Sequence, residues 1–241
     1  MEKNMVNVLD LFCGCGGLSQ GFIDAGYNVV LGVDFDEAAL KTFKYNHKDS
    51  AILKADLSTE KGLTEIEKKL GETEIDVIIA GPPCQGFSLT GSRDINDTRN
   101  TLYLAVVKAV KRFKPKAFLI ENVPGIATLY NGVVKQQIIN TFEDLGYSVS
   151  VSDKPLLAAD YGVPQMRKRM FFIGYRKEYG YFKFPKPTHS AENYVTCGDA
   201  LSDLPSREDN VGEEIDNYTL PPQSAYQEYM RQNSNKLYNL C

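Results

Sequence analysis

Short apolar or β-branched runs alternate with longer amphipathic stretches over the first 175 or so residues of the chain. The short runs have the length of strands, and the longer stretches repeat apolar residues at helical spacing. The expected strands are residues 6–12, 28–34, 51–56, 75–81, 116–123, 147–154 and 170–175. The expected helices are residues 18–26, 36–46, 63–71, 99–113 and 133–146. Strand and helix in regular alternation predict an α/β fold with a doubly wound, mostly parallel sheet and helices on both faces.

The pattern changes after about residue 185, where prolines and acidic residues interrupt the alternation. One short helix is expected near residues 224–233, and the rest of this part reads as irregular surface. We therefore expect a ligand-binding catalytic domain over residues 1–185 and an irregular acidic segment over residues 186–241 that leads toward a missing region.

The composition is that of an ordinary globular domain, because 43% of the 241 residues are apolar and 24% are charged. No apolar run approaches the length of about 20 residues that a membrane span needs, and no secretory signal is recognisable at the start. The five cysteines form no C-x-x-C pair, and two histidines are too few for an obvious zinc site. We expect reduced cysteines, no metal, no membrane partner and a place in the cytosol.

The net charge of −4 is unevenly distributed along the chain. Residues 191–241 hold nine acidic and three basic side chains, a net charge of −6, which leaves +2 on the first 190 residues. Global charge is a weak guide when charge is segregated in this way, so a nucleic-acid partner stays open.

A glycine-rich turn, DLFCGCGG, follows the first expected strand at residues 10–17. In a doubly wound sheet this turn usually contacts a ligand. The dinucleotide pattern G-x-G-x-x-G fails here, because a count from Gly14 puts Ser19 where the third glycine belongs. A nicotinamide dehydrogenase is therefore disfavoured.

Acidic residues end the second and third expected strands, at Asp34 and Asp56. An acid at the first position can accept hydrogen bonds from ribose hydroxyls, and one at the second can accept from an adenine amino group. An adenosyl ligand without a phosphate, such as S-adenosylmethionine, fits this pattern. The alternative is that both acids only cap the following helices, although Asp36 is a better cap for the helix at 36–46.

A stiff turn, GPPCQGFS, follows the fourth expected strand at residues 81–88 and places Cys84 at the carboxyl end of that strand. A lone cysteine is more often buried and inert. His47 and His189 lie in no triad context, which disfavours acyl transfer and leaves a thiol that adds to an activated electrophile. Glu121 ends the fifth strand, so we expect its carboxyl group beside Cys84.

A basic stretch, QMRKR, leads into the last expected strand at residues 165–169. Alternation along a strand predicts that Gln165, Arg167 and Arg169 share one face. The alternative is a solvated basic edge that discourages strand pairing, and Lys168 fits that description.

These four motifs together resemble the C5-cytosine-specific DNA methyltransferases of bacterial restriction-modification systems. DLFCGCGGLSQGF resembles the family's cofactor motif, GPPCQGFS its nucleophile motif, ENV its acid motif and QMRKR its Q-x-R-x-R motif. They occur in the family's order, and the resemblance covers residues 5 to about 240. It implies the Rossmann-like fold of S-adenosylmethionine-dependent methyltransferases.

The resemblance implies a role for each matched residue. Cys84 is the nucleophile, Glu121 contacts the edge of the cytosine ring, and Arg169, or else Arg167, contacts its 2-keto oxygen. The implied cofactor contacts are Phe12, Gly14, Gly16, Gly17, Asp34, Phe35, Asp56, Leu57 and Pro83. The implied DNA contacts are Gln85, Ser88 and Arg93, in a loop over residues 87–99 that closes on a base flipped out of duplex DNA.

The chain departs from the family pattern in two ways. Asp34 stands where glutamate is more usual, and the target-recognition region with the last two motifs is absent before Cys241. We expect either a truncated chain or one half of a split enzyme whose second chain supplies the rest, with weak or no methylation by this chain alone. The alternatives are a tRNA cytosine-5 methyltransferase and a non-catalytic subunit that binds the cofactor.

Overall fold

The computed structural model describes residues 5–83, 102–127, 129–206, 213, 215–231 and 234–238. The chain divides into two compact units. The first unit joins Met1–Pro155 with Arg169–Phe184, and the second joins Leu156–Lys168 with Pro185–Cys241.

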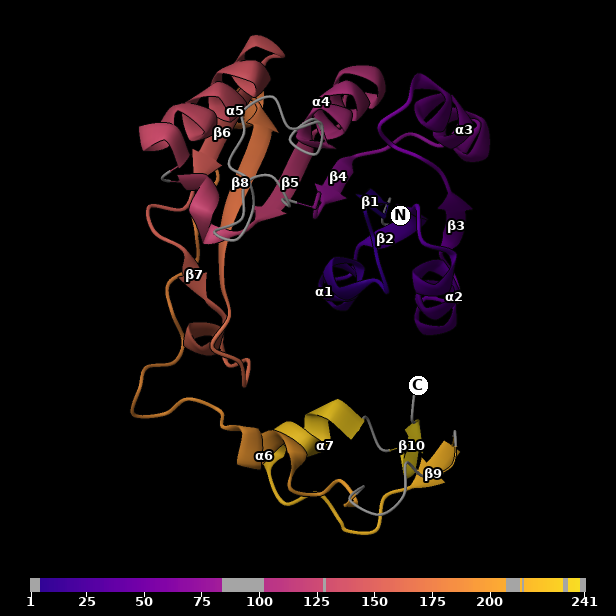
Figure 1. Cartoon of the computed structure of the whole chain (residues 1–241), viewed down its shortest axis with the longest axis vertical. Coiled ribbons are helices and arrows are strands. Elements are labelled where there is room, and N and C mark those ends of the chain that lie inside the picture. Colours follow the sequence, from indigo (N-terminus) through magenta and orange to yellow (C-terminus); the bar gives the residue numbers. More distant parts are fainter. Residues whose placement is uncertain are drawn as a thin grey trace. The chain divides into compact units, whose positions relative to one another are not determined.

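A mostly parallel sheet with the strand order β3-β2-β1-β4-β5-β8-β6 forms the centre of the first unit, and the two-residue β7 (Leu156–Leu157) pairs with β8 (Figure 1). Neighbouring strands from β3 to β5 are all parallel. The path reverses direction between β1 and β4, and in sheets of this kind ligands usually bind at the carboxyl ends of the strands beside such a reversal. The predicted fold class is confirmed. The strands are β1 (Asn7–Leu11), β2 (Asn28–Asp34), β3 (Ala51–Lys54), β4 (Val77–Ala80), β5 (Ala117–Asn122), β6 (Tyr147–Val151) and β8 (Lys168–Arg176).

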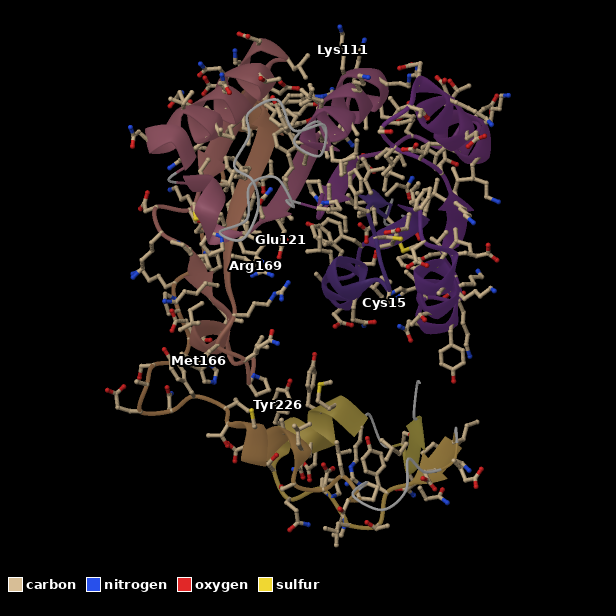
Figure 2. All side chains as sticks on the ribbon, viewed as in Figure 1. Cys15, Lys111, Glu121, Met166, Arg169 and Tyr226 are labelled. Atoms are coloured by element: carbon tan, nitrogen blue, oxygen red, sulfur yellow. The ribbon has the colours of Figure 1, made fainter. Side chains whose placement is uncertain are left out.

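Strand β8 runs antiparallel to both of its neighbours in this order, β5 and β6. Phe171 pairs with Glu121, and Met170 pairs with Asn122. Because the two directions oppose, β8 begins at the edge of the sheet where β5 ends. The next residue toward the start of β8, Arg169, therefore reaches the side of Glu121 (Figure 2). The sequence predicted this strand but not its direction.

Two hydrophobic cores cover the two faces of the sheet. Leu9 and Leu11 of β1 lie in one core, and Val8, which points the other way, lies in the second. The first core holds residues of α3 (Glu60–Leu70), α4 (Leu102–Phe113) and α5 (Val133–Asp144). The second core holds residues of α1 (Gly17–Asp24) and α2 (Glu37–Asn46). The five predicted helices are thus present, on both faces, although residues 99–101 of the predicted fourth helix lie outside the described residues.

Side-chain caps determine where two of these helices begin. The Asp36 carboxylate accepts hydrogen bonds from the backbone N–H groups of Ala38 and Ala39, at 2.7 and 3.3 Å, and so caps α2 as expected. Thr59 Oγ1 accepts from the N–H of Gly62 at 3.1 Å, so α3 begins three residues earlier than its apolar spacing predicts. None of the helices in the described part of the chain is long and apolar enough to span a membrane.

The second unit has more regular structure than the sequence predicted. It contains α6 (Cys197–Leu201), α7 (Ala225–Arg231) and a hairpin of β9 (Ile215–Asn217) with β10 (Lys236–Tyr238). Only α7 was predicted. The segment over residues 186–241 is therefore not irregular throughout.

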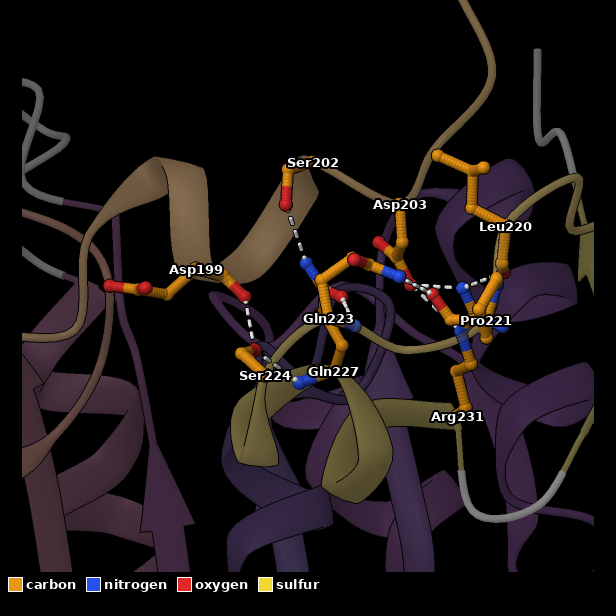
Figure 3. Close-up of polar contacts among 9 residues, drawn as sticks. All are labelled: Asp199, Ser202, Asp203, Leu220, Pro221, Gln223, Ser224, Gln227 and Arg231. Atoms are coloured by element: carbon orange, nitrogen blue, oxygen red, sulfur yellow. Dashed lines mark hydrogen bonds and ion pairs between the residues drawn. The ribbon is translucent and has the colours of Figure 1, made fainter.

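A buried ion pair joins the loop after α6 to the end of α7 (Figure 3). Arg231 Nε donates to Asp203 Oδ2 at 2.7 Å, and the two residues are 7% and 2% exposed. The same guanidinium donates to the carbonyl of Leu220 at 2.8 Å and lies 3.7 Å from the centre of the Tyr218 ring. Gln227 adds a bond to Ser202 at 3.0 Å. Among the described residues, a buried polar network thus joins these two helices.

Candidate active site

The glycine-rich turn after β1 is held in an unusual backbone conformation. Phe12, with φ of +58°, occupies the left-handed region that a bulky side chain rarely adopts. Gly14 and Gly16 also have positive φ, at +53° and +93°. The turn is tied to β2 by the N–H of Cys13, which donates to the carbonyl of Val33 at 3.1 Å. Strained turns of this kind persist only where the surroundings hold them, and they gather at functional sites.

The side chain of Asp34, at the end of β2, binds the backbone of this turn. Its Oδ2 accepts the N–H of Gly14 at 2.8 Å, and its Oδ1 accepts the N–H of Asp36 at 2.9 Å. Asp34 does not cap α2, because Asp36 does. Each carboxylate oxygen has a second lone pair. The half-exposed carboxylate can therefore accept a further hydrogen bond from a ligand beside the turn.

A shallow hollow of about 380 Å³ lies beyond the ends of β2 and β3, lined by both Phe35 and Asp56. The Phe35 side chain is 72% exposed at this position. Asp56 Oδ1 accepts from the N–H and hydroxyl of Ser58, at 2.9 and 2.6 Å, and these bonds hold the pKa of the carboxyl below its usual range. The cap of α3 is Thr59, so Asp56 is not a helix cap either. Leu57, the next residue along the chain, is buried.

A buried carboxyl group lies at the start of the glycine-rich turn. Asp10 is fully buried in β1, and Ser19 of α1 donates to its Oδ2 at 2.6 Å. Burial raises the pKa of Asp10 to about 7, and the negative charge of Asp34 acts in the same direction. Burial also raises the pKa of Cys13 well above its usual range, so this cysteine stays a neutral thiol. The sequence did not predict the hydrogen bond between Ser19 and Asp10, because this bond depends on the packing of α1 on β1.

The ends of β5 and β8 bring the predicted acid and base together. Arg169 Nε lies 2.7 Å from Glu121 Oε1, and both side chains are less than a quarter exposed, at 22% and 23%. The end of β4 is also close, because a Cβ atom on Gly81 would lie 3.9 Å from Glu121 Oε2. Pro83 is exposed two residues further on. Cys84, Gln85, Ser88 and Arg93 lie outside the described residues, and their roles stay predictions.

Gln165 and Arg167 do not share a strand with Arg169, so the expected common face is wrong. Strand β8 begins only at Lys168. Before it, the N–H of Gln165 donates to Val163 at 2.7 Å and the N–H of Arg167 donates to Gln165 at 2.8 Å, which are tight turns. Arg167 belongs to the second unit, whereas Arg169 lies in the same unit as Glu121. Within the described residues, no cluster of His, Cys, Asp and Glu could hold a metal ion.

Comparisons with known proteins agree with this geometry. A family model for C-5 cytosine-specific DNA methylase matches residues 6–239. Type II methyltransferase M.DdeI of Desulfomicrobium norvegicum is 41% identical over 240 residues, which cover 97% of this chain and 57% of the relative. Type II methyltransferase M.AquIA of Picosynechococcus is 34% identical over 227 residues, which cover 85% of this chain and 90% of the relative. A solved structure described as a prophage-encoded DNA modification methyltransferase of E. coli matches 97% of this chain and 70% of its own, with 29% identity and a TM-score of 0.76.

The first three curated relatives are longer than this chain, which spans 57%, 59% and 54% of their lengths. The family match nevertheless extends over nearly all of the sequence, and it includes the turn after β1 and the ends of β5 and β8. The chain therefore belongs to the C-5 cytosine-specific DNA methylase family.

Proposed function

We propose that this chain is the catalytic portion of a DNA (cytosine-5-)-methyltransferase that transfers a methyl group from S-adenosylmethionine to C5 of a cytosine in duplex DNA. The observation that carries the proposal is the Glu121–Arg169 pair at the ends of β5 and β8. An acid and a guanidinium in contact, next to the strand that leads to Cys84, are the groups that activation of a cytosine ring requires.

The crevice beyond β1, β2 and β3 fits S-adenosylmethionine, which would supply the methyl group. Asp34 would accept from the ribose hydroxyls, and Asp56 would accept from the adenine amino group in the hollow beside Phe35. The remaining proposed contacts are Phe12, Gly14, Gly16, Gly17, Leu57 and Pro83. The lowered pKa keeps the Asp56 carboxylate ionised at neutral pH, so both of its oxygens can only accept.

In the proposed reaction the Cys84 thiolate adds to C6 of the cytosine and forms a carbon–sulfur bond. The electron pair of the C5–C6 double bond moves toward C5, which would bond to the methyl carbon as the bond from that carbon to sulfur breaks, with S-adenosylhomocysteine as the leaving group. Glu121 holds a proton at N3, and the guanidinium of Arg169 stabilises negative charge at O2. Loss of the C5 proton to solvent then expels the Cys84 thiolate and restores the ring. Arg167 is the second candidate for the contact with O2.

DNA is the proposed macromolecular partner, and the target base must leave the helix before Cys84 can reach it. We propose Gln85, Ser88 and Arg93 as contacts to the DNA around that base. We also propose that recognition of the target sequence needs further polypeptide, in the same chain or in a second one, because most of the relatives reported above are longer. M.AquIA is a relative of similar length, because this chain covers 90% of it. The proposed place of action is the bacterial cytosol.

The decisive experiment traps the covalent adduct. The chain is incubated with S-adenosylmethionine and duplex DNA that contains 5-fluorocytosine, whose fluorine blocks the final elimination, and the intact mass is measured. A mass increase that maps to Cys84 and disappears in Cys84→Ser supports the proposal. A negative result is followed by the same reaction with the C-terminal part of M.DdeI added, and failure there refutes the proposal.

A parallel reaction with 5-fluorocytosine in RNA tests the tRNA methyltransferase alternative. An adduct with RNA and none with DNA would replace the proposed substrate with that alternative. Cofactor binding without an adduct on either nucleic acid would favour the non-catalytic subunit.

A further inference from the structure

Two side chains at the end of α2 reach back to the glycine-rich turn, 31 residues earlier in the chain. Asn46 Nδ2 donates to the carbonyl of Cys15 at 3.3 Å, and His47 Nε2 lies 3.1 Å from the carbonyl of Gly16. A carbonyl oxygen can only accept, so His47 Nε2 carries the proton and donates. With the Asp34 bond to the N–H of Gly14, three consecutive residues of the turn each have a backbone group bound by a side chain.

The His47 ring is fixed in place by its surroundings. The residue is only 5% exposed, and its ring packs edge-on against the fully buried Phe43, with 4.7 Å between the ring centres. Its own N–H donates to the carbonyl of Phe43 at 2.8 Å and ends α2. The position of Nε2 is thus set by the core, so this hydrogen bond transmits the rigidity of the core to the turn.

The fit between His47 and Gly16 is tight enough to explain the glycine. A Cβ atom on Gly16 would lie 2.1 Å from His47 Nε2, far inside van der Waals contact. The carbonyl of Gly16 also accepts the N–H of Gln20 at 2.9 Å, which is the first hydrogen bond of α1. No side chain caps α1 at Gly16. His47 therefore holds the peptide group from which α1 starts, beside the proposed cofactor crevice.

We propose that His47 is a positioning residue for S-adenosylmethionine. Its Nε2–H fixes the Gly16 peptide and so keeps the glycine-rich turn in the conformation that the cofactor contacts, with Asn46 in a lesser role. The inference rests on the proposed cofactor. It assigns His47 no part in the transfer itself, because its Nε2 is already engaged with the backbone.

The test compares two variants that each remove one buried hydrogen bond from a side chain to a backbone carbonyl. His47→Phe keeps a ring and removes the bond to Gly16. Tyr147→Phe removes the bond from the Tyr147 hydroxyl to the carbonyl of Pro115, which is 2.7 Å long and lies at the amino end of β6, away from the turn. His47→Gln offers an amide donor and serves as the rescue. For each variant, the Kd for S-adenosylhomocysteine is measured by calorimetry and the Tm is measured without ligand.

The loss of a hydrogen bond of about 1 kcal/mol corresponds to a Kd about fivefold higher for His47→Phe. We expect a partial return toward the original Kd in His47→Gln and an unchanged Kd in Tyr147→Phe, although its Tm falls too. Equal Kd values for His47→Phe and Tyr147→Phe would overturn the inference.

Hydrogen exchange without ligand separates this inference from the proposed function. His47→Phe should speed exchange of the amides of Gly16 and Gln20, whereas Tyr147→Phe should not. If the unaltered chain binds no S-adenosylhomocysteine yet the exchange result holds, the proposed cofactor is wrong and His47 only stabilises the turn. If the exchange rates do not change, the geometric basis of the inference is wrong.

Discussion

Arg169 and Glu121 are 48 positions apart in the sequence and in contact in the structure, with 2.7 Å between Arg169 Nε and Glu121 Oε1. The antiparallel register of β5 and β8 creates this contact. One carboxylate oxygen is engaged by the guanidinium, which fixes the orientation of both groups before a substrate arrives. Groups that are oriented in advance need little reorganisation during a reaction.

Replacement of either partner should slow adduct formation much more than it affects cofactor binding. For Glu121→Gln and Arg169→Lys we expect at least about a 100-fold lower rate, the usual loss when one oriented electrostatic contact is removed. The rate is measured in a single turnover on DNA with 5-fluorocytosine, using the complete enzyme. Arg176→Lys is the matched control, because Arg176 lies at the other end of β8 and bonds to the carbonyl of Pro115 at 3.1 Å. Similar rates for Arg169→Lys and Arg176→Lys would contradict the assignment.

Asp34 and Asp56 should respond differently to removal. Asp34→Ala leaves the N–H of Gly14 without its partner, so we expect both weaker binding of S-adenosylhomocysteine and a lower Tm. Asp56→Ala breaks only exposed local bonds to Ser58, so binding should weaken by about tenfold while the Tm hardly changes. Calorimetry and thermal melting on the two variants check this. A normal Kd in Asp56→Ala would remove Asp56 from the adenine site.

The stability of the first unit should decrease as the pH rises toward neutrality, because of Asp10. Its pKa is about 7 in the folded chain and 3.8 as the reference value, so between these values the folded state binds a proton that the unfolded state has lost. The free energy of unfolding then falls with rising pH, by up to about 1.4 kcal/mol per pH unit. Above pH 7 Asp10 is ionised in the folded chain too, and the free energy of unfolding stops falling on its account.

Asp10→Asn keeps an oxygen that accepts from Ser19 and removes the charge. We expect the variant to melt at a higher temperature than the unaltered chain at pH 8, and the difference to shrink near pH 5. Thermal melting across this range is the measurement. Parallel pH profiles for the two proteins would show that Asp10 is ionised throughout.

Loss of one partner of the buried Arg231–Asp203 pair should destabilise the second unit strongly, whereas replacement of both partners by apolar residues should destabilise it little. Arg231→Ala leaves Asp203 buried without its partner, a change that usually costs about 3–5 kcal/mol. The double variant Arg231→Met with Asp203→Leu should recover most of that loss, because it removes both charges. Hydrogen exchange of the α7 amides reports on this unit, and Glu228→Gln on the exposed side of α7 is the control. Equal protection in Arg231→Ala and Glu228→Gln would mean that the pair contributes little.

The parallel part of the fold could be predicted because its information is local. Alternating apolar runs define β1 to β5, and a short polar residue in front of a helix pattern marks a cap, as Asp36 does for α2. The positions of Asp34, Asp56 and Glu121 at strand ends follow from the same reading.

The features that could not be predicted depend on contacts between distant parts of the chain. The antiparallel insertion of β8 between β5 and β6 leaves no trace in the pattern of residues 170–175, since both strand directions alternate in the same way. His47 bonds to a carbonyl 31 positions away, and Arg231 bonds to a carboxylate 28 positions away. The alternating pattern of residues 165–169 also predicted a strand wrongly at Gln165 and Arg167. Backbone hydrogen bonds form tight turns there in place of an extended conformation.

The place of β8 in the sheet also determines when the catalytic edge can form. In the order of the described strands β6 ends the sheet and adjoins only β8, which is made later. A growing chain that has not reached Lys168–Arg176 therefore has no ladder partner for Tyr147–Val151 and leaves one edge of β5 open. The strand that closes this gap is the same strand that carries Arg169 to Glu121. During synthesis, completion of the sheet and assembly of the acid–guanidinium pair are thus a single folding event, and an incompletely folded chain has no such pair.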